Sequence, residues 1–405
     1  MQRLRIAGAL VAGSVIATAA MGQWIAEPLH PSGLAGSAAL AIDEDAFGPW
    51  PRPVIAGFAR SANDHAGTWA IGFPLAFESV HPAGWEDSQC LDVQGGQRVG
   101  FTSNGAGFDV NRAALWQGDP ATYVGLHPDG ALESLALGVY EGQQVGIARF
   151  ADANRAGLWR GDADSWTALH PDGALESEAY AAGADADGPL QAGWVKYEED
   201  AARATIWRGT PGSATDVHPD GFAQSWIYAV DGGVQAGVAL VTGFPDARAA
   251  LWRGTAGSFV SLHPGWADYS VAYGSWDRYQ VGLARDAMGT TRAMLWRSRA
   301  DRAEDLHAVL PARFSHSEAR GVWSDDRFIY VAGIGYTISG IEALMWSREV
   351  SCHVDLDGDG ELTIFDFLAF QNLFDAGDRH ADFDGDGLLT FFDFLAFQNE
   401  FDAGC

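Results

Sequence analysis

The sequence predicts a mainly β fold, a seven-bladed β-propeller, followed by a small α-helical domain. A loose pattern of about 45 residues recurs between residues 23 and 350, and each copy contains four short strand candidates bounded by Gly, Asp and Pro. Four strands at such a period are typical of a propeller blade. After residue 350 a different pattern of 27 residues occurs twice.

Two markers set the number of blades. One is a His usually followed by Pro, and the other is a Trp usually preceded by Leu, Ile or Met. Each occurs seven times, at His30, His81, His127, His170, His218, His263 and His307, and at Trp69, Trp116, Trp159, Trp207, Trp252, Trp296 and Trp346. Seven blades are therefore predicted. Six or eight stay open because the outer repeats diverge, and a solenoid of sheets is the alternative architecture.

The order of the markers predicts how the ring closes. His30 precedes the first Trp marker, and Trp346 has no His marker after it. The N-terminal strand that leads to His30 can therefore complete the blade that ends at Trp346. Such pairing joins the two ends of the domain and removes exposed strand edges.

The repeated residues are expected to be structural. A zinc site needs three or four ligands that converge on one ion, whereas one His per blade would be spread around a ring. We expect the histidines to bond backbone in turns and the tryptophans to pack between blades. Five other aromatic residues are expected in loops or outer strands, where they permit sugar stacking but are equally explained by packing: Trp85, Trp226, Trp266, Trp276 and Tyr269. The blades loosely resemble bacterial extracellular β-propeller repeats that read A-x-L-W-x-G, a resemblance that assigns no activity.

The charge balance and the N-terminus predict an exported protein. The chain has 25 Lys and Arg against 53 Asp and Glu, a net charge of −28. This argues against nucleic-acid binding, which depends on basic side chains, and solubility is the simplest explanation for most of the acidity. Residues 1–22 are expected to be a signal peptide, because Arg3 and Arg5 precede about 15 apolar residues, too few to span a membrane. We expect no membrane span and a secreted, extracellular or cell-surface location.

No catalytic residue is assigned from the sequence. It contains no G-x-S-x-G, H-E-x-x-H or P-loop motif. A propeller glycosidase or lyase would instead bring two or three carboxylates from different blades to the ring centre, and only their proximity in space can reveal them.

The doubled sequence after residue 350 matches the pattern of 12-residue calcium loops. In the first loop the predicted ligands are the side chains of Asp355, Asp357, Asp359, Thr363 and Asp366 and the backbone carbonyl of Glu361. In the second they are the side chains of Asp382, Asp384, Asp386, Thr390 and Asp393 and the carbonyl of Leu388. Hard oxygen donors at this spacing favour two Ca²⁺ ions over Mg²⁺. Crowded carboxylates repel each other without a cation, so metal binding and folding should be coupled.

Two cysteines flank the doubled sequence, Cys352 just before it and Cys405 at its end. We predict a disulfide between them, which in the chain-entropy model would stabilise the segment by about 4 kcal/mol. Two free thiols are the alternative. The third cysteine, Cys90, is expected to be a buried small apolar residue.

Each calcium loop is followed by one apolar helix and preceded by none. This arrangement, the early Cys, the Gly-Cys ending, and Asp rather than Glu at loop position 12 resemble a GC-type dockerin over residues 352–405. The resemblance implies Ca²⁺ binding and docking to a cohesin-like module on a scaffold or cell surface, often by a protein whose other module binds or degrades polysaccharide. Loop positions 10 and 11, often small polar recognition residues in dockerins, form the predicted partner surface: Ile364, Phe365, Phe391 and Phe392.

The predicted organisation is a signal peptide (1–22), a propeller (23–350) and a dockerin (351–405). The predicted function is that of an exported, non-catalytic binding propeller tethered by a calcium-dependent dockerin to a cohesin-like partner, with polysaccharide as a candidate ligand. One alternative is a polysaccharide-degrading enzyme, a glycoside hydrolase or lyase with its active site in the propeller. Another is a calcium-binding surface protein without a cohesin partner.

Overall fold

The computed structural model describes residues 23–44, 53–71, 76–105, 110–118, 121–199, 201–241, 246–325, 328–349, 354–357, 362–383 and 388–403. The predicted signal peptide and six other predicted positions lie outside these ranges: Cys352, Cys405, Asp359, Glu361, Asp384 and Asp386. Within the ranges, no helix is long and apolar enough to cross a membrane. The chain divides into two compact units, one of Ala26–Ser347 and one of residues 1–25 with 348–405. Each is described by itself.

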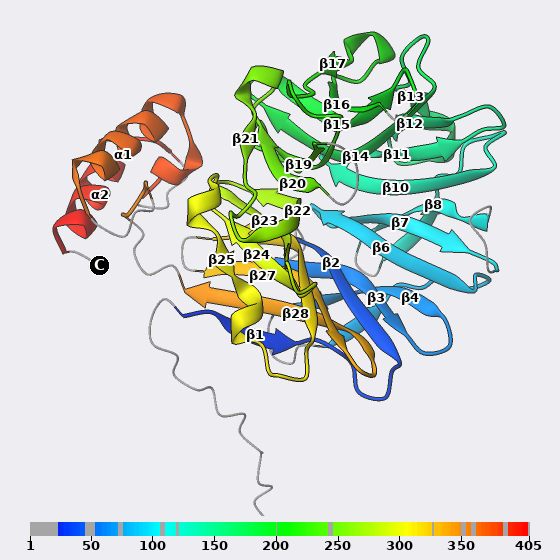
Figure 1. Cartoon of the computed structure of the whole chain (residues 1–405), viewed down its shortest axis with the longest axis horizontal. Helices are drawn as coiled ribbons and strands as arrows, with labels where there is room; N and C mark the ends of the chain where they lie inside the picture. The colour runs from blue at the N-terminus through cyan, green and yellow to red at the C-terminus, as the bar shows by residue number, and fades with distance from the viewer. Residues whose placement is uncertain are drawn as a thin grey trace, which may run out of the picture. The chain divides into compact units, whose positions relative to one another are not determined.

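The first unit is a seven-bladed β-propeller built from seven four-stranded sheets (Figure 1). The first three sheets in chain order are β2–β5 (Gly36–Glu44, Pro53–Arg60, Asp64–Ala70, Phe77–Ser79), β6–β9 (Asp87–Gln94, Gln97–Ser103, Arg112–Gln117, Thr122–Gly125) and β10–β13 (Glu133–Tyr140, Gln143–Arg149, Asn154–Trp159, Thr167–Ala168). The next three are β14–β17 (Glu176–Asp185, Gly188–Lys196, Ala202–Trp207, Thr215–Asp216), β18–β21 (Gln224–Asp231, Val234–Leu240, Ala247–Trp252, Val260–Ser261) and β22–β25 (Ala267–Trp276, Tyr279–Asp286, Thr291–Trp296, Glu304–Asp305). The predicted blade number and the four strands per repeat are confirmed.

The seventh sheet closes the ring. It contains β26–β28 (His316–Ser324, Phe328–Thr337, Gly340–Glu349) and takes its fourth strand from the start of the chain, β1 (Ile25–Pro28), in the order β1-β28-β27-β26. The Leu29 backbone N–H donates to the Ala343 carbonyl at 2.8 Å. The first strands of the sheets form the inner ring, in which β2 contacts both β6 and β26. The closure predicted from the marker order is therefore correct.

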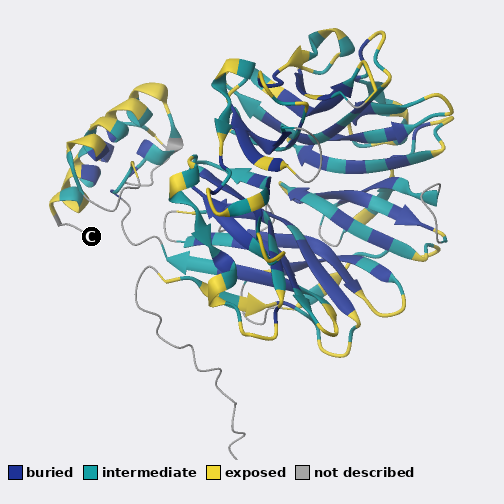
Figure 2. Ribbon diagram, viewed as in Figure 1, coloured by how far each residue is buried: buried dark blue, intermediate teal, exposed yellow. Residues whose placement is uncertain are grey.

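Large aromatic side chains fill the space between neighbouring sheets. All seven Trp markers are among the largest fully buried side chains, and Figure 2 shows burial concentrated along the strands. Trp252 of β20, for example, packs in one cluster with Leu190 and Ile206 of the preceding blade. Cys90 is buried in a similar cluster, where burial raises the pKa of its thiol to about 12. The packing roles predicted for the tryptophans and for Cys90 are confirmed.

Each His marker anchors one blade to the next through a serine. His218 Nε2 lies 2.9 Å from the Phe222 carbonyl, and its Nδ1 lies 2.7 Å from Ser225 Oγ. Because a carbonyl only accepts, Nε2 carries the proton and Nδ1 accepts from the hydroxyl. Ser225 Oγ accepts in turn from the Ala204 N–H at 2.9 Å, and so joins β16 to β18. Burial lowers the pKa of His218, which favours this neutral form.

The same connection occurs seven times around the ring. The histidine Nδ1 atoms lie 2.7–2.8 Å from the hydroxyls of Ser37, Ser88, Ser134, Ser177, Ser225, Ser270 and Ser317. Each of these serine side chains is buried. The expectation that the histidines bond backbone in turns is confirmed at His218 and at the equivalent positions in other blades.

Replacing Ser225 by Ala is expected to lower the free energy of unfolding of the propeller by about 2 kcal/mol. The change leaves the buried Ala204 N–H and the His218 Nδ1 without their partner, and an unmade buried hydrogen bond costs about 1–3 kcal/mol. Urea unfolding followed by tryptophan fluorescence measures the loss. Ser339→Ala, in the exposed β27–β28 turn, is the control. A loss below about 0.5 kcal/mol for Ser225→Ala would contradict this role.

Not every aromatic residue lies where the sequence predicts. Trp85 and Trp266 lie in connections between strands, but Trp226 is on β18, and Tyr269 and Trp276 are on β22. Their expected placement in loops or outer strands is wrong, because β18 and β22 are the first, innermost strands of their sheets. Trp226 and Tyr269 pack together in one apolar cluster, and Trp276 packs against the cluster that contains Trp323.

The second unit is built around two helices, α1 (Ile364–Ala376) and α2 (Phe391–Ala403), with a short 3₁₀ turn η7 (Arg379–Ala381) between them. Its core contains Phe370 and Phe397, whose rings stack at 4.5 Å with an angle of 16° between their planes. Helix α1 ends at Gly377, whose φ of 73° is the left-handed conformation that glycine adopts without strain.

Candidate metal centre

The first acidic loop is fixed to helix α1 by a capping box. Thr363 is the N-cap residue, and its Oγ1 accepts from the Phe365 N–H at 3.1 Å. Asp366, three residues later, accepts from the Thr363 N–H at 2.8 Å. This reciprocal arrangement satisfies backbone donors that the first helical turn would otherwise leave unpaired.

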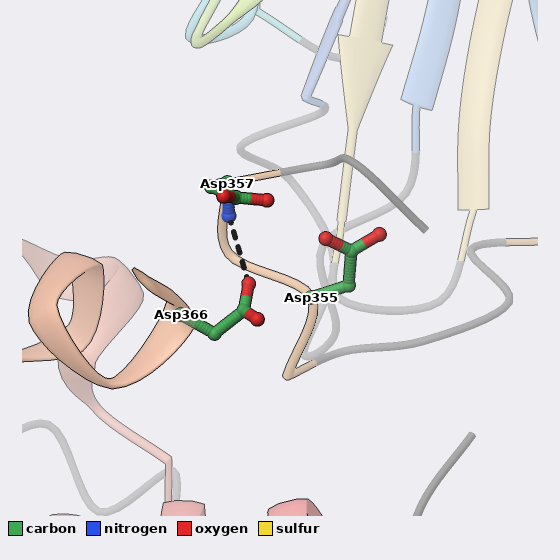
Figure 3. Close-up of side chains that lie close together, drawn as sticks. All are labelled: Asp355, Asp357 and Asp366. Atoms are coloured by element: carbon green, nitrogen blue, oxygen red, sulfur yellow. Dashed lines mark hydrogen bonds between the residues drawn. The ribbon is translucent and has the colours of Figure 1, made fainter. Parts of the chain in front are cut away.

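Three of the predicted ligands converge in this loop. Asp355, Asp357 and Asp366 each offer a carboxylate oxygen, and these oxygens all lie within 4.8 Å of one another. Figure 3 shows the three side chains and the hydrogen bond from the Asp357 N–H to Asp366 Oδ1, which is 3.1 Å long. Among the described residues this is the one cluster of three or more acidic, His or Cys side chains with metal-ligand spacing. The seven His markers do not form such a group.

The charge of this cluster suits a hard divalent cation. Asp366 is fully buried, and it accepts from the backbone N–H groups of Asp357 and Thr363, which polarise a carboxylate but carry no full charge. Burying a carboxylate beside two others is unfavourable unless a cation compensates. The donor set is entirely oxygen, as Ca²⁺ and Mg²⁺ prefer. The described residues of the loop therefore fit the predicted ion, with Thr363 beside them at the helix start.

The second loop repeats the features of the first wherever it is described. Asp393 is fully buried like Asp366, and its Oδ2 accepts from the Thr390 N–H at 2.6 Å. Thr390 Oγ1 accepts from the Phe392 N–H at 3.1 Å, the same length as in the first loop. Asp382 precedes this segment, and Leu388 is exposed. The two loops therefore make the same hydrogen bonds where each one meets the start of its helix.

The predicted partner-surface residues are strongly exposed. Their relative exposures are 64% for Ile364, 62% for Phe365, 65% for Phe391 and 66% for Phe392. Leu368 and Leu395, one turn later on each helix, extend the two patches at 45% and 37%. Large apolar side chains this open are unusual when they cluster, and clusters of this kind commonly mark interaction sites.

The comparisons with known proteins bear on the propeller. No family model matches the chain, and no curated protein matches it. Similar solved structures include a puromycin hydrolase S511A mutant complexed with PGG (TM-score 0.50, 14% identity, 78% of this chain and 57% of that chain) and a structure from a study of two prolyl endopeptidases (TM-score 0.50, 8% identity, 78% and 51%). The β-propeller domain of the Trilobed protease from Pyrococcus furiosus also matches (TM-score 0.47, 9% identity, 77% and 96%). This chain thus spans about half the length of the hydrolase and endopeptidase chains, and the likeness shows the fold alone.

Proposed function

We propose that the protein is an exported binding propeller whose C-terminal unit is a calcium-dependent docking module of the dockerin kind. Its partner would be a cohesin-like module on a scaffold or cell surface. The observation that carries this proposal is the pair of exposed apolar patches, each beginning immediately after an acidic loop. A small unit that kept both patches in water would expose much apolar surface, which a docking partner would cover.

The pairing of the two repeats supports a docking surface with internal symmetry. Phe370 and Phe397 are 27 residues apart, the repeat length, and they stack on each other. Phe367 and Phe394, the next equivalent pair, meet edge to face at 5.9 Å. Contacts between equivalent residues are what a local two-fold axis produces. The patches at Phe365 and Phe392 are then interchangeable, and one partner could be bound in two orientations.

The acidic loops would couple this surface to calcium. Bound Ca²⁺ would supply the positive charge that Asp355, Asp357 and Asp366 need in order to stay together at the start of α1. Asp366 connects the loop to the helix, because the same carboxylate accepts from Asp357 in the loop and from Thr363 at the helix N-cap. Order in the loop is thereby transmitted to Ile364 and Phe365, the next two residues of that helix.

Substituting all four patch residues by Ser is expected to weaken cohesin binding at least 100-fold. Phe365→Ser alone and Phe392→Ser alone should each change the affinity by less than about threefold, because the other patch still offers the second orientation. Biolayer interferometry of the full chain against a panel of recombinant cohesin modules, in Ca²⁺ and in EDTA, measures this. Ile338→Ser, which replaces an even more exposed apolar residue on the propeller, is the control.

Two outcomes would contradict the proposal. One is binding by the four-residue variant that equals wild type, and the other is cohesin binding that persists in EDTA. Absence of binding to any cohesin in the panel, with Ca²⁺ bound normally, would favour the alternative of a calcium-binding surface protein without this partner.

The enzymatic alternative needs two carboxylates that face a common substrate. Glu178 and Glu318 each follow the buried Ser of an innermost strand, on β14 and β26, but two blades separate them. Glu318 is also paired with Arg320. Asp43 and Asp92, on the neighbouring innermost strands β2 and β6, are a closer pair, and burial raises the pKa of each to about 7. Asp43 is buried, however, and Asp92 already accepts from the Val139 N–H of the next blade, so we favour binding over catalysis. Release of new reducing ends or unsaturated products from a polysaccharide panel by the full chain would reverse that preference.

A further inference from the structure

Every innermost strand has an irregularity at the same place. In β14 the pairing with β15 passes from Ala179 directly to Ala181, so Tyr180 has no partner there. The residues skipped in this way are Leu40, Leu91, Leu137, Tyr180, Tyr228, Tyr273 and Arg320. Bulges of this kind redirect a side chain out of the regular sheet. All seven side chains are partly exposed, and each follows a buried residue.

The seven bulge residues form two different arcs of the inner ring. Three successive blades contribute leucines, and the other four contribute Tyr180, Tyr228, Tyr273 and Arg320, which we call the tyrosine arc. The ring centroids of Tyr180 and Tyr228 lie 5.2 Å apart, and those of Tyr228 and Tyr273 lie 5.6 Å apart. The Arg320 guanidinium lies 4.2 Å from the Tyr273 centroid. Four blades thus present one continuous surface of aromatic rings that ends in a cation.

The charged groups at the two ends of the tyrosine arc are hydrogen-bonded within the protein. Glu318 pairs with Arg320 and also accepts from the Tyr336 hydroxyl at 2.8 Å. At the other end, Glu178 accepts from the hydroxyl of Tyr180, from Asn154 and from the Trp194 indole. Burial raises the pKa of Glu178 above the ordinary value for a glutamate. An anionic ligand would therefore find the Arg320 charge already paired, and a ligand at Glu178 would compete with three hydrogen bonds.

The central tyrosines keep free hydrogen-bonding capacity. Within the part of the chain that the structure describes, the hydroxyls of Tyr228 and Tyr273 form no hydrogen bond, and neither hydroxyl is among the fully enclosed polar atoms. Burial raises the pKa of Tyr273 to about 12 and that of Tyr228 still further, so both remain donors. Trp226 and Tyr269 pack beside them in the same cluster. The two central hydroxyls thus remain available as donors and acceptors.

We propose that the tyrosine arc binds a neutral carbohydrate ring. A sugar ring presents C–H groups on its faces and hydroxyls around its edge, so it can pack against the exposed part of this aromatic surface and hydrogen bond with the hydroxyls of Tyr228 and Tyr273. Ligand sites commonly combine aromatic walls with a few placed polar groups in this way. The leucine side of the ring, at Leu40, Leu91 and Leu137, offers apolar contact without competing donors. The site lies wholly within the propeller, and it depends on neither the calcium loops nor docking.

Calorimetric titration of the full chain with cellobiose, xylobiose, mannobiose and lactose tests the proposal, with glucuronic acid and choline as charged comparators. At least one neutral disaccharide should bind, equally in Ca²⁺ and in EDTA. Tyr228→Phe and Tyr273→Phe each remove one hydroxyl and leave the ring, and each should weaken that binding about tenfold, which corresponds to about 1.4 kcal/mol. The matched control is Tyr123→Phe. It removes a hydroxyl that is hydrogen-bonded to Thr102, away from the innermost strands, and it should bind sugar like wild type.

Three results would overturn the proposal. They are no binding of any neutral disaccharide, tighter binding of a charged comparator, and unchanged sugar affinity in both Tyr→Phe variants. Sugar binding lost in EDTA would also overturn it, because it would assign the site to the calcium unit. Since docking is measured separately on cohesin modules, failure of one proposal leaves the other distinguishable.

Discussion

Replacing Asp366 and Asp393 together by Asn is expected to weaken Ca²⁺ binding by at least about 100-fold at both loops. Asparagine keeps an oxygen that can accept from the Thr363 and Thr390 N–H groups, so the helix caps survive. It removes one charge and the option of bidentate ligation at position 12, the position that closes such loops. The variant therefore separates the capping role of the two carboxylates from their metal role.

The effect on stability is expected to be large. An ion at 1,000 times its dissociation constant stabilises the folded state by about 4 kcal/mol for each site. In the wild type, EDTA should therefore unfold α1 and α2, and the double Asn variant should resemble chelated wild type even in excess Ca²⁺. Far-ultraviolet circular dichroism with and without Ca²⁺ measures the helices, and calorimetry measures Ca²⁺ affinity. Helices that are unchanged by EDTA, or Ca²⁺ affinity within threefold of wild type in the variant, would refute the calcium assignment.

The control lies in the same molecule. Fifteen of the 16 tryptophans lie in the propeller unit and none lies after residue 347, so tryptophan fluorescence follows the propeller and not the helices. The propeller transition should be the same in wild type, in the double variant and in EDTA.

Asp43→Asn is expected to stabilise the propeller at pH 8 by up to about 4 kcal/mol and to have little effect at pH 4. Asp43 is buried on the innermost strand β2. Burial is the main cause that raises its pKa from 3.8 to about 7, with Asp92 and Asp231 adding repulsion. Each pKa unit corresponds to about 1.4 kcal/mol. The folded state therefore favours the protonated carboxyl more strongly than the unfolded state does.

The direction of the pH dependence follows from that raised pKa. Near pH 4 the wild type has the full benefit of the protonated side chain, and this benefit is lost as pH rises towards 7 and above. Asparagine cannot ionise, so the free energy of unfolding of the variant lacks this part of the pH dependence. Urea unfolding at pH 4, 6 and 8, followed by tryptophan fluorescence, measures the difference, with exposed Asp129→Asn as control. An equal effect of Asp43→Asn at pH 4 and pH 8 would show that the ionisation of Asp43 does not cause this pH dependence.

The architecture of the propeller was predictable because its markers are countable. A tryptophan between every two sheets is needed to fill the gap, so seven such residues indicate seven blades. The offset between His30 and Trp346 showed how the ends meet. The serine connections were harder to predict, since Ser37 and its equivalents are small residues whose importance lies in one buried hydroxyl. Only the path of β16 beside β18 shows that Ser225 bonds a preceding blade.

One candidate site could be predicted from the sequence, and the other could not. The converging Asp355, Asp357 and Asp366 were predictable because loop geometry brings nearby residues together. A Thr-x-x-Asp pattern at Thr363 also signals a capping box, and it could have revealed the second role of Asp366. The tyrosine arc was not predictable, because its members are about 45 residues apart and become neighbours only through the bulges of four separate blades.

Ring closure by β1 has a consequence for how the molecule is made. Ser37 joins Ala343 across 306 residues, whereas the equivalent bonds elsewhere span 21 to 24 residues. Six blade junctions can form as the chain emerges during synthesis, but the seventh must await the last strand. Contacts so distant in sequence form slowly. Until then β28 is an open edge, so the newly made chain is most prone to aggregate just before β1 pairs with it.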